Sequence, residues 1–336
     1  MSGADVQREL DRLREGPLKL AYLTYRGKPH VGGQGVYTRH LTKALVDLGH
    51  HVEVYGGQPY PVLDQRIALH KLPSLDIFND QYPGRFPKVA SRLPRIVVVS
   101  ENSINDIHTD MGVSLDRMRL VPVGVDPDLF KPLPSVARKP HHLITTASAD
   151  VALKGLSYLL EAVAKLRTER DIHLTIIGKP RAGASADLIE SLGLKDCISY
   201  VSGVSDERIV ELYAESTLAV VPSLYEGFSL PSVEAMSTGI CLVATTGGAL
   251  PEVTGKDGET VLSCPPADAD ALAAAIRRGL DDETLRTRIG LAGRQRVVER
   301  WSWRYCASLT VDQYREVLAM PHNVEKLRRR LEKTSK

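Results

Sequence analysis

The sequence contains few cysteines and no long apolar run, and neither sign of charge dominates it. The scattered cysteines form no CxxC pair and have no clustered histidines beside them, which argues against a disulfide framework or a zinc site and fits a reducing cytoplasm. They are Cys197, Cys241, Cys264 and Cys306. No apolar stretch reaches the length of about 18 residues that a membrane-spanning helix needs. Residues 1–15 are charged and lack an apolar core, so no secretory signal is expected.

The charge balance and composition narrow the function classes further. The 43 Lys and Arg residues nearly cancel the 41 Asp and Glu residues, and the formal net charge of +2 argues against a simple, strongly basic nucleic-acid binder. A hydrophobic content of 43% excludes a disordered chain. A length of 336 residues favours two domains over one.

Short apolar runs alternate with helical patterns in the first third of the chain. A glycine-rich loop at residues 27–35 precedes helical spacing at 36–48, which ends at Gly49. The predicted strands cover residues 18–24, 51–55, 67–71 and 96–100. Apolar strands that alternate with helices predict a parallel sheet covered on both faces.

A proline-rich stretch separates this pattern from a second one. Residues 122–140 hold five of the 20 prolines and are interpreted as a linker. Beyond it, strands are predicted at 143–147, 172–178, 198–201, 218–222 and 241–245, and helices at 155–167, 209–214, 231–237, 271–280, 285–300 and 304–318. The predicted organisation is a first domain at 1–122, a linker at 123–141, a second domain at 142–302 and a terminal segment at 303–336.

The strongest motif is SLYEGFSLP at residues 223–231, in which Glu226 is followed eight residues later by Glu234. It follows a predicted strand and opens a predicted helix, and parallel sheets bind ligands at the carboxyl ends of their strands. The backbone N–H groups of residues 227–229 would lie at the positive helix terminus, which stabilises a phosphate without a metal. The alternative is a capped surface helix with two solvated glutamates.

These residues resemble the retaining nucleotide-sugar glycosyltransferases of family 4, whose signature is the E-x7-E element and whose α/β GT-B fold has two Rossmann-like domains facing a central cleft. Other stretches agree with that family: Gly32–Gly33–Gln34–Gly35, residues 124–130, Lys154–Gly155, and TGGALPEV at 246–253. The resemblance covers about residues 18–56 and 95–320. It implies that the terminal helix packs back on the N-terminal, acceptor-side domain and that the second domain binds the donor.

The resemblance also implies a role for each site residue. Glu226 would contact hydroxyls of the donor sugar, Glu234 would bind the ribose hydroxyls, and Lys154 would pair with the diphosphate. Glu226 and Lys154 are the implied catalytic residues. The remaining donor-binding positions are Gly32, Gly33, Gly227, Phe228, Ser229 and Leu230. The implied donor is a UDP- or GDP-linked sugar, and the acceptor is an unidentified sugar, lipid or small molecule.

The chemistry accounts for this set of residues. Breaking the sugar–phosphate bond leaves positive charge on the sugar and negative charge on the diphosphate, which fixed cations and N–H donors stabilise. Metal-using transferases commonly place an Asp-x-Asp string at the phosphates. The clearest such string, Asp268–Ala269–Asp270, precedes an alanine-rich helix and is interpreted as an N-cap. Neither a metal nor a cofactor is expected.

The sequence departs from the family pattern in two places. Ser148 and Ala149 stand where members usually have an Arg before the Lys-Gly pair. The cations that could replace it are Arg26, Lys28 and Lys179.

The second departure is a short first domain. Only 24 residues, 72–95, separate two predicted strands, and they lack the Thr-x-His type motif and much of the acceptor site that the family has there. Pro87–Lys88 is interpreted as a seam. Either the natural protein is shortened, or residues of a longer protein are absent from this sequence, which an intact mass well above 36.9 kDa would support.

Three alternatives concern function and location. A non-catalytic nucleotide-sugar binding protein is favoured if the segment is truly absent. An NAD-dependent Rossmann oxidoreductase would use Gly33–Gln34–Gly35 with Glu53 as the ribose acid, although Thr38 stands at the third glycine position. The tail at 323–336 holds six Lys and Arg and two Glu. It is interpreted as a solvated helix, with attachment to the inner face of an anionic membrane as the alternative to a purely cytoplasmic location.

Overall fold

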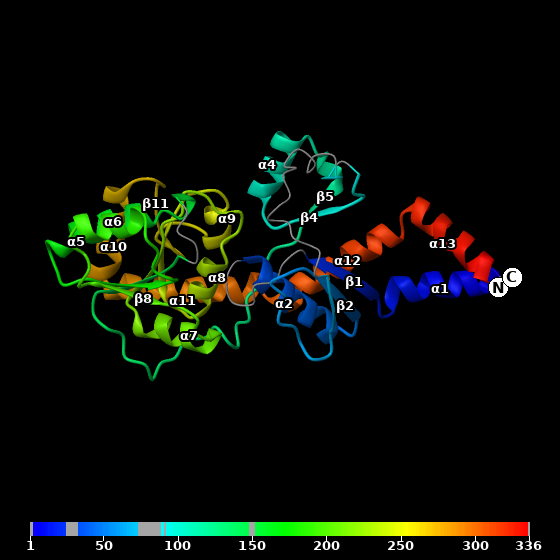
Figure 1. Ribbon diagram of the computed structural model, residues 1–336, viewed down its shortest axis with the longest axis horizontal. Coiled ribbons are helices and arrows are strands. Elements are labelled where there is room, and N and C mark those ends of the chain that lie inside the picture. Colours follow the sequence, from blue (N-terminus) through cyan, green and yellow to red (C-terminus); the bar gives the residue numbers. More distant parts are fainter. Residues whose placement is uncertain (1–2, 25–32, 73–88, 91, 148–151, 335–336) are drawn as a thin grey trace. The chain divides into compact units, whose positions relative to one another are not determined.

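The structure is a computed structural model that describes residues 3–24, 33–72, 89–90, 92–147 and 152–334 (Figure 1). The chain divides into two compact units. The first comprises residues 1–98, 104–121 and 303–336, and the second comprises residues 99–103 and 122–302.

The first unit contains two small parallel sheets and the terminal helices. Strands β1 (Lys19–Thr24), β2 (His51–Gly56) and β3 (Ala68–Lys71) pair in that order, and β4 (Ile96–Val98) pairs with β5 (Met118–Leu120). The helices are α1 (Gly3–Glu15), α2 (Gly33–Asp47), most of α4 (Glu101–Met111), α12 (Trp303–Leu318) and α13 (Pro321–Thr334). Helix α12 contacts α2, where Trp303 stacks on His40 at 5.2 Å between ring centroids.

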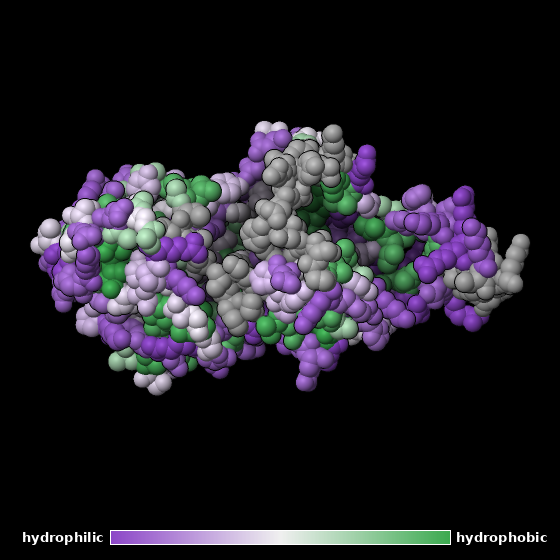
Figure 2. All heavy atoms as spheres, in the orientation of Figure 1, coloured by the Kyte–Doolittle hydropathy of each residue, from purple (hydrophilic) through white to green (hydrophobic). Residues whose placement is uncertain are grey.

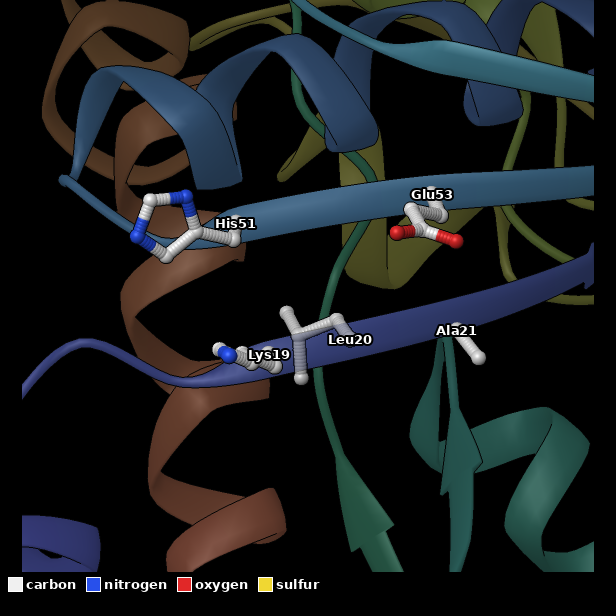
Figure 3. A pocket seen from close by; sticks show the side chains of 5 residues that line it. All are labelled: Lys19, Leu20, Ala21, His51 and Glu53. Carbon is white, nitrogen blue, oxygen red and sulfur yellow. The ribbon is translucent and has the colours of Figure 1, made fainter.

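The β1–β2–β3 sheet corrects the prediction that both faces are covered. Val52 and Val54 are buried on one face, whereas His51 and Glu53 are exposed on the other. A hollow of about 530 Å³ lies on that exposed face, lined by side chains of β1 and β2 (Figure 3). Parallel sheets are usually covered on both faces, so this described part of the first unit lacks a layer.

The second unit is a six-stranded parallel sheet between helices, with strand order β11-β10-β9-β6-β7-β8. The strands are β6 (His142–Thr146), β7 (His173–Ile177), β8 (Ile198–Val201), β9 (Leu218–Val221), β10 (Cys241–Thr245) and β11 (Leu262–Cys264). The helices are α5 (Leu156–Arg167), α6 (Ala184–Ser191), α7 (Asp206–Glu215), α8 (Leu230–Ser237), α9 (Leu250–Thr254), α10 (Ala269–Asp281) and α11 (Glu283–Arg300). Leu143, Leu160 and Leu174 are completely buried in its core.

This strand order contains a topological switch point. The chain runs outward from β6 through β7 to β8, and then returns to place β9 on the other side of β6. The carboxyl ends of β6 and β9 therefore lie side by side at this point, which is where Rossmann-type sheets bind their ligands.

The predicted linker packs against the second unit. Residues 122–140 belong to the second unit, because their apolar side chains are buried there: Val125 is 2% exposed and Phe130 is 5% exposed. The Ser237 hydroxyl donates to the Phe130 carbonyl at 2.6 Å, which ties the segment to α8. The proline content of this stretch reflects an irregular but packed path.

Candidate functional site

Three loops of the second unit meet at the switch point. The first follows β6 and carries Lys154 in a short 3-10 turn (Ala152–Lys154), the second follows β9 and carries Glu226, and the third follows β10 and carries Gly247 and Gly248. All three leave the same edge of the sheet, since its strands are parallel. The structure therefore gathers three of the motifs found in the sequence.

Lys154 and Glu226 form an ion pair. The Nζ atom of Lys154 lies 2.7 Å from Oε1 of Glu226, and their side chains are 34% and 11% exposed respectively. The buried Ser223 hydroxyl donates to the same oxygen at 2.8 Å. Burial of a carboxylate is unfavourable unless it is hydrogen-bonded, and these two donors supply such bonds. The family resemblance implied a separate ligand for each of these two residues and did not indicate their mutual contact.

Gly155 allows the first two loops to approach each other. Its φ is +64°, and a Cβ atom there would lie 1.9 Å from the carbonyl oxygen of Pro222. The Leu224 N–H donates to the Leu153 carbonyl at 2.8 Å. Any residue larger than glycine would force the two loops apart and separate Lys154 from Glu226.

The paired glycines of the third loop also allow two loops to approach each other closely. A Cβ atom at Gly247 would lie 2.3 Å from the Leu224 carbonyl oxygen, and one at Gly248 would lie 2.4 Å from the Glu226 carbonyl oxygen. The Ala249 N–H donates to that Glu226 carbonyl at 2.8 Å. The backbone around Glu226 is thus held from both sides.

Residues 227–230 lead from Glu226 into α8. Ser229 is the N-cap residue and has a φ of +90°, an uncommon conformation for a residue other than glycine. Phe228 is buried and packs edge-on against Trp301, with 5.6 Å between ring centroids. Because the Phe228 ring is buried, only the backbone of this residue is placed to approach a ligand. Gly227 and Leu230 are partly buried.

Glu234 is partly buried in α8. It is the fifth residue of that helix and lies about one turn from its start. Burial raises the pKa of Glu234 to about 7, and the negative charge of Asp206 adds to the increase. The site thus contains an acid that exchanges its proton near neutral pH.

The remaining sequence candidates fall outside this cluster. Gly32, Arg26 and Lys28, together with Ser148 and Ala149, lie outside the described residues. Gly33 is the exposed first residue of α2 in the first unit. Lys179 is exposed and follows β7, so it leaves the same sheet edge as Lys154.

Two other polar side chains, Asp268 and His108, have structural roles. The Asp268 carboxylate accepts the Ala271 N–H at 2.8 Å and caps α10, which confirms the N-cap interpretation. His108 contacts the Val113 carbonyl at 2.8 Å through Nδ1. Within the described residues, no three His, Cys, Asp or Glu side chains converge as a metal site.

The tail forms helix α13, whose surface is largely hydrophilic in Figure 2. Arg329 pairs with Glu325 at 3.0 Å, so part of its positive charge is balanced within the helix. Across the described ranges, every helix is too short or too polar to cross a membrane.

Two family models match the chain. The model described as "Glycosyl transferases group 1" matches residues 134–296, which include all three loops. The model described as "Glycosyltransferase Family 4" matches residues 31–96. The matches thus fall on both units.

Curated relatives agree with these models. The MMP alpha-(1->4)-mannosyltransferase of Mycolicibacterium hassiacum is 36% identical over 408 aligned positions, covering 90% of this chain and 99% of the relative. Because 408 positions exceed the 336 residues of the chain, at least 72 positions of the relative have no counterpart here. The O-antigen chain mannosyltransferase B of Escherichia coli is 35% identical over 169 residues, which are 48% of this chain and 42% of that protein.

Solved structures share the fold. Sucrose-phosphate synthase from Thermosynechococcus elongatus superposes with a TM-score of 0.76 at 21% identity, over 90% of this chain and 99% of that one. The Anabaena protein HepE, solved with UDP and glucose, superposes with a TM-score of 0.73 at 18% identity, over 88% and 99% of the two chains.

Proposed function

The chain belongs to the family 4 glycosyltransferases of GT-B fold, and we propose that it transfers a sugar from a UDP- or GDP-linked donor to an acceptor with retention of anomeric configuration and without a metal ion. The observation that carries the proposal is the Lys154–Glu226 pair at the switch point, where a cation and a carboxylate lie 2.7 Å apart. HepE, a structural neighbour, was solved with UDP-glucose, which supports a nucleotide-sugar donor.

The pair can serve both halves of such a donor. An ammonium group has three N–H donors, so Lys154 can keep its bond to Glu226 and still donate to diphosphate oxygens. That contact would stabilise the negative charge that develops on the leaving diphosphate. Glu226 would accept hydrogen bonds from donor-sugar hydroxyls and so orient the sugar.

The same edge of the sheet can hold the rest of the donor. The N-terminus of α8 follows Glu226 directly and offers backbone N–H groups to phosphate oxygens. Glu234 in that helix is the proposed acceptor for the ribose hydroxyls. Together, Lys154, the start of α8 and Glu234 would bind phosphate and ribose without a bound cation.

Mannose is the favoured transferred sugar. The relative with 36% identity is named as an alpha-(1->4)-mannosyltransferase, and its alignment covers nearly all of its length. We propose a small carbohydrate as the acceptor class on the same ground. Residence in the cytoplasm, with peripheral contact of the basic α13 with a membrane, remains part of the proposal.

A turnover assay tests the proposal. Purified protein is incubated with UDP- and GDP-linked glucose or mannose and a panel of mono- and disaccharide acceptors, and nucleotide release and product anomer are followed by chromatography and NMR. Lys154→Ala and Glu226→Ala should each lower kcat by about 100- to 1,000-fold. Lys195→Ala, at an exposed lysine of the same unit, is the matched control. An excess of EDTA should change nothing, and equal turnover by all variants would contradict the site assignment.

A non-catalytic nucleotide-sugar binding protein is the second candidate. The exposed face of the β1–β2–β3 sheet and the unmatched positions of the mannosyltransferase relative, at least 72 in number, favour it. Saturable donor binding without transfer to any acceptor, and without hydrolysis, would support this candidate over the enzyme. The NAD alternative is disfavoured because Glu53 lies mid-strand in β2 and pairs with His70 at 3.0 Å.

A further inference from the structure

Ser223 lies between β9 and Glu226 and is 2% exposed. Its hydroxyl donates to Oε1 of Glu226 at 2.8 Å, which is the oxygen that also accepts the Lys154 ammonium at 2.7 Å. Within the described residues, both donors to this carboxylate therefore meet on one oxygen. The other oxygen, Oε2, has no protein donor among those residues.

The backbone of Ser223 is itself fixed by the neighbouring strand. The hydroxyl of Thr245, the last residue of β10, donates to the Ser223 carbonyl. Thr245 is 3% exposed, so this link is shielded from water. A buried chain of hydrogen bonds consequently runs from the end of β10 through Ser223 to the Glu226 carboxylate.

We propose that Ser223 is a positioning residue that fixes the orientation of the Glu226 carboxylate toward the donor sugar. A carboxylate bonded only to the flexible Lys154 side chain could rotate or follow the lysine toward the phosphates when a donor binds. The second donor, on a rigid loop, holds Oε1 in place and leaves Oε2 for a sugar hydroxyl. This inference rests on the proposed donor site.

The first test separates sugar recognition from nucleotide recognition. Ser223→Ala should lower kcat/KM for the sugar donor by about 10- to 100-fold, the effect of losing a hydrogen bond to a charged group. Its affinity for bare UDP or GDP should change less than 2-fold, because no sugar is present. Ser216→Ala removes an equally buried hydroxyl that donates to the Leu212 carbonyl in α7, and it should leave both quantities unchanged.

A double-mutant cycle separates positioning from a structural role. Since Ser223 acts through Glu226, Ser223→Ala should have no further effect on kcat/KM in a Glu226→Ala background. If Ser223→Ala melts at a lower temperature than wild type, Ser223→Cys, which keeps a weak donor, replaces it in the cycle.

Each outcome decides the matter. Additive losses in the double variant, or an unaffected Ser223→Ala enzyme beside an active wild type, would overturn this inference alone. A wild-type protein that turns over no nucleotide sugar would overturn the proposed transferase activity and this inference with it, and one that also binds none would overturn the donor site as well.

Discussion

Glu234→Gln should stabilise the free protein at alkaline pH while it weakens nucleotide binding. Burial raises the pKa of Glu234 from 4.5 to about 7 in the folded state. The folded protein therefore holds a proton between pH 4.5 and 7 that the unfolded chain has released, and stability falls as pH rises through this window. Above pH 7 Glu234 is ionised in the folded protein as well, so its buried charge lowers the free energy of unfolding by the full amount. A pKa shift of this size corresponds to about 3 kcal/mol.

Glutamine has nearly the same shape and no charge, so it removes this cost. At pH 8 the variant should unfold at a temperature higher by up to about 10 °C, given about 2–4 °C per kcal/mol for a domain of this size. At pH 4 both proteins carry an uncharged side chain at this position, and their melting temperatures should agree. Glu259→Gln, at an exposed glutamate of the same unit, is the control and should melt like wild type at both pH values.

Calorimetry and thermal melting at pH 4, 6 and 8 provide the assay. In wild type, nucleotide diphosphate affinity should increase from pH 6 to 8 as Glu234 ionises and accepts the ribose hydroxyls. In the variant, affinity should be weaker at pH 8 and nearly independent of pH. Unchanged or lower stability of Glu234→Gln at pH 8, or a stability difference equal at pH 4 and pH 8, would refute the reasoning.

Further predictions concern the loops, the α10 cap and the chain length. Gly155→Ala should unfold far more easily than Gly193→Ala, because both positions have a φ near +65° but only at Gly155 would a Cβ atom meet a carbonyl within 4 Å. Denaturant titration should show a loss of unfolding free energy of about 1 kcal/mol for Gly193→Ala and a larger loss for Gly155→Ala. Equal losses would contradict the close approach of the two loops. Asp268→Ala should lower the unfolding free energy by about 1 kcal/mol through the lost α10 cap and leave nucleotide affinity unchanged. Asp270→Ala, at an exposed residue, should change stability by less than about 0.5 kcal/mol. Loss of a metal-dependent turnover in Asp268→Ala would contradict a purely capping role. Mass spectrometry of the protein from its natural source should give a mass well above 36.9 kDa, and a value near 36.9 kDa would show a genuinely reduced protein.

Most of the sheet of the second unit could be predicted from the sequence. Strands β8 and β10 have the predicted bounds, 198–201 and 241–245. The apolar run of β10 marks a strand that is buried on both faces, whereas every residue of β8 is only partly buried. Strands β5 and β11 were missed because each has only three residues, which is too short to show a pattern of apolar residues.

The contacts of the site could not be predicted in the same way. The E-x7-E motif and the Lys-Gly pair identified the loops, but Lys154 and Glu226 are 72 residues apart and meet only because β9 pairs with β6. Strand order follows from the packing of the whole sheet. The part played by Ser223 was missed for the same reason, although its place three residues before Glu226 in a buried loop was a usable signal.

The packing of the predicted linker could not be read from the sequence for a different physical reason. The prolines at 122–140 indicated a linker, and in the structure Val125 and Phe130 bury their side chains while Arg294 donates to the Phe130 carbonyl at 3.2 Å. The apolar residues between the prolines outweigh the turn signal, because burial of a phenylalanine contributes about 1.5–3 kcal/mol.

The most direct test of the account is a calorimetric titration of the protein with UDP, GDP, ADP and NAD. We expect one nucleoside diphosphate to bind at a single site, Lys154→Ala to weaken that binding by about 10- to 100-fold, and Lys256→Ala, at an exposed lysine, to leave it unchanged. Binding of NAD alone, no binding of any nucleoside diphosphate, or binding that Lys154→Ala does not weaken would contradict a donor site at the loops after β6, β9 and β10.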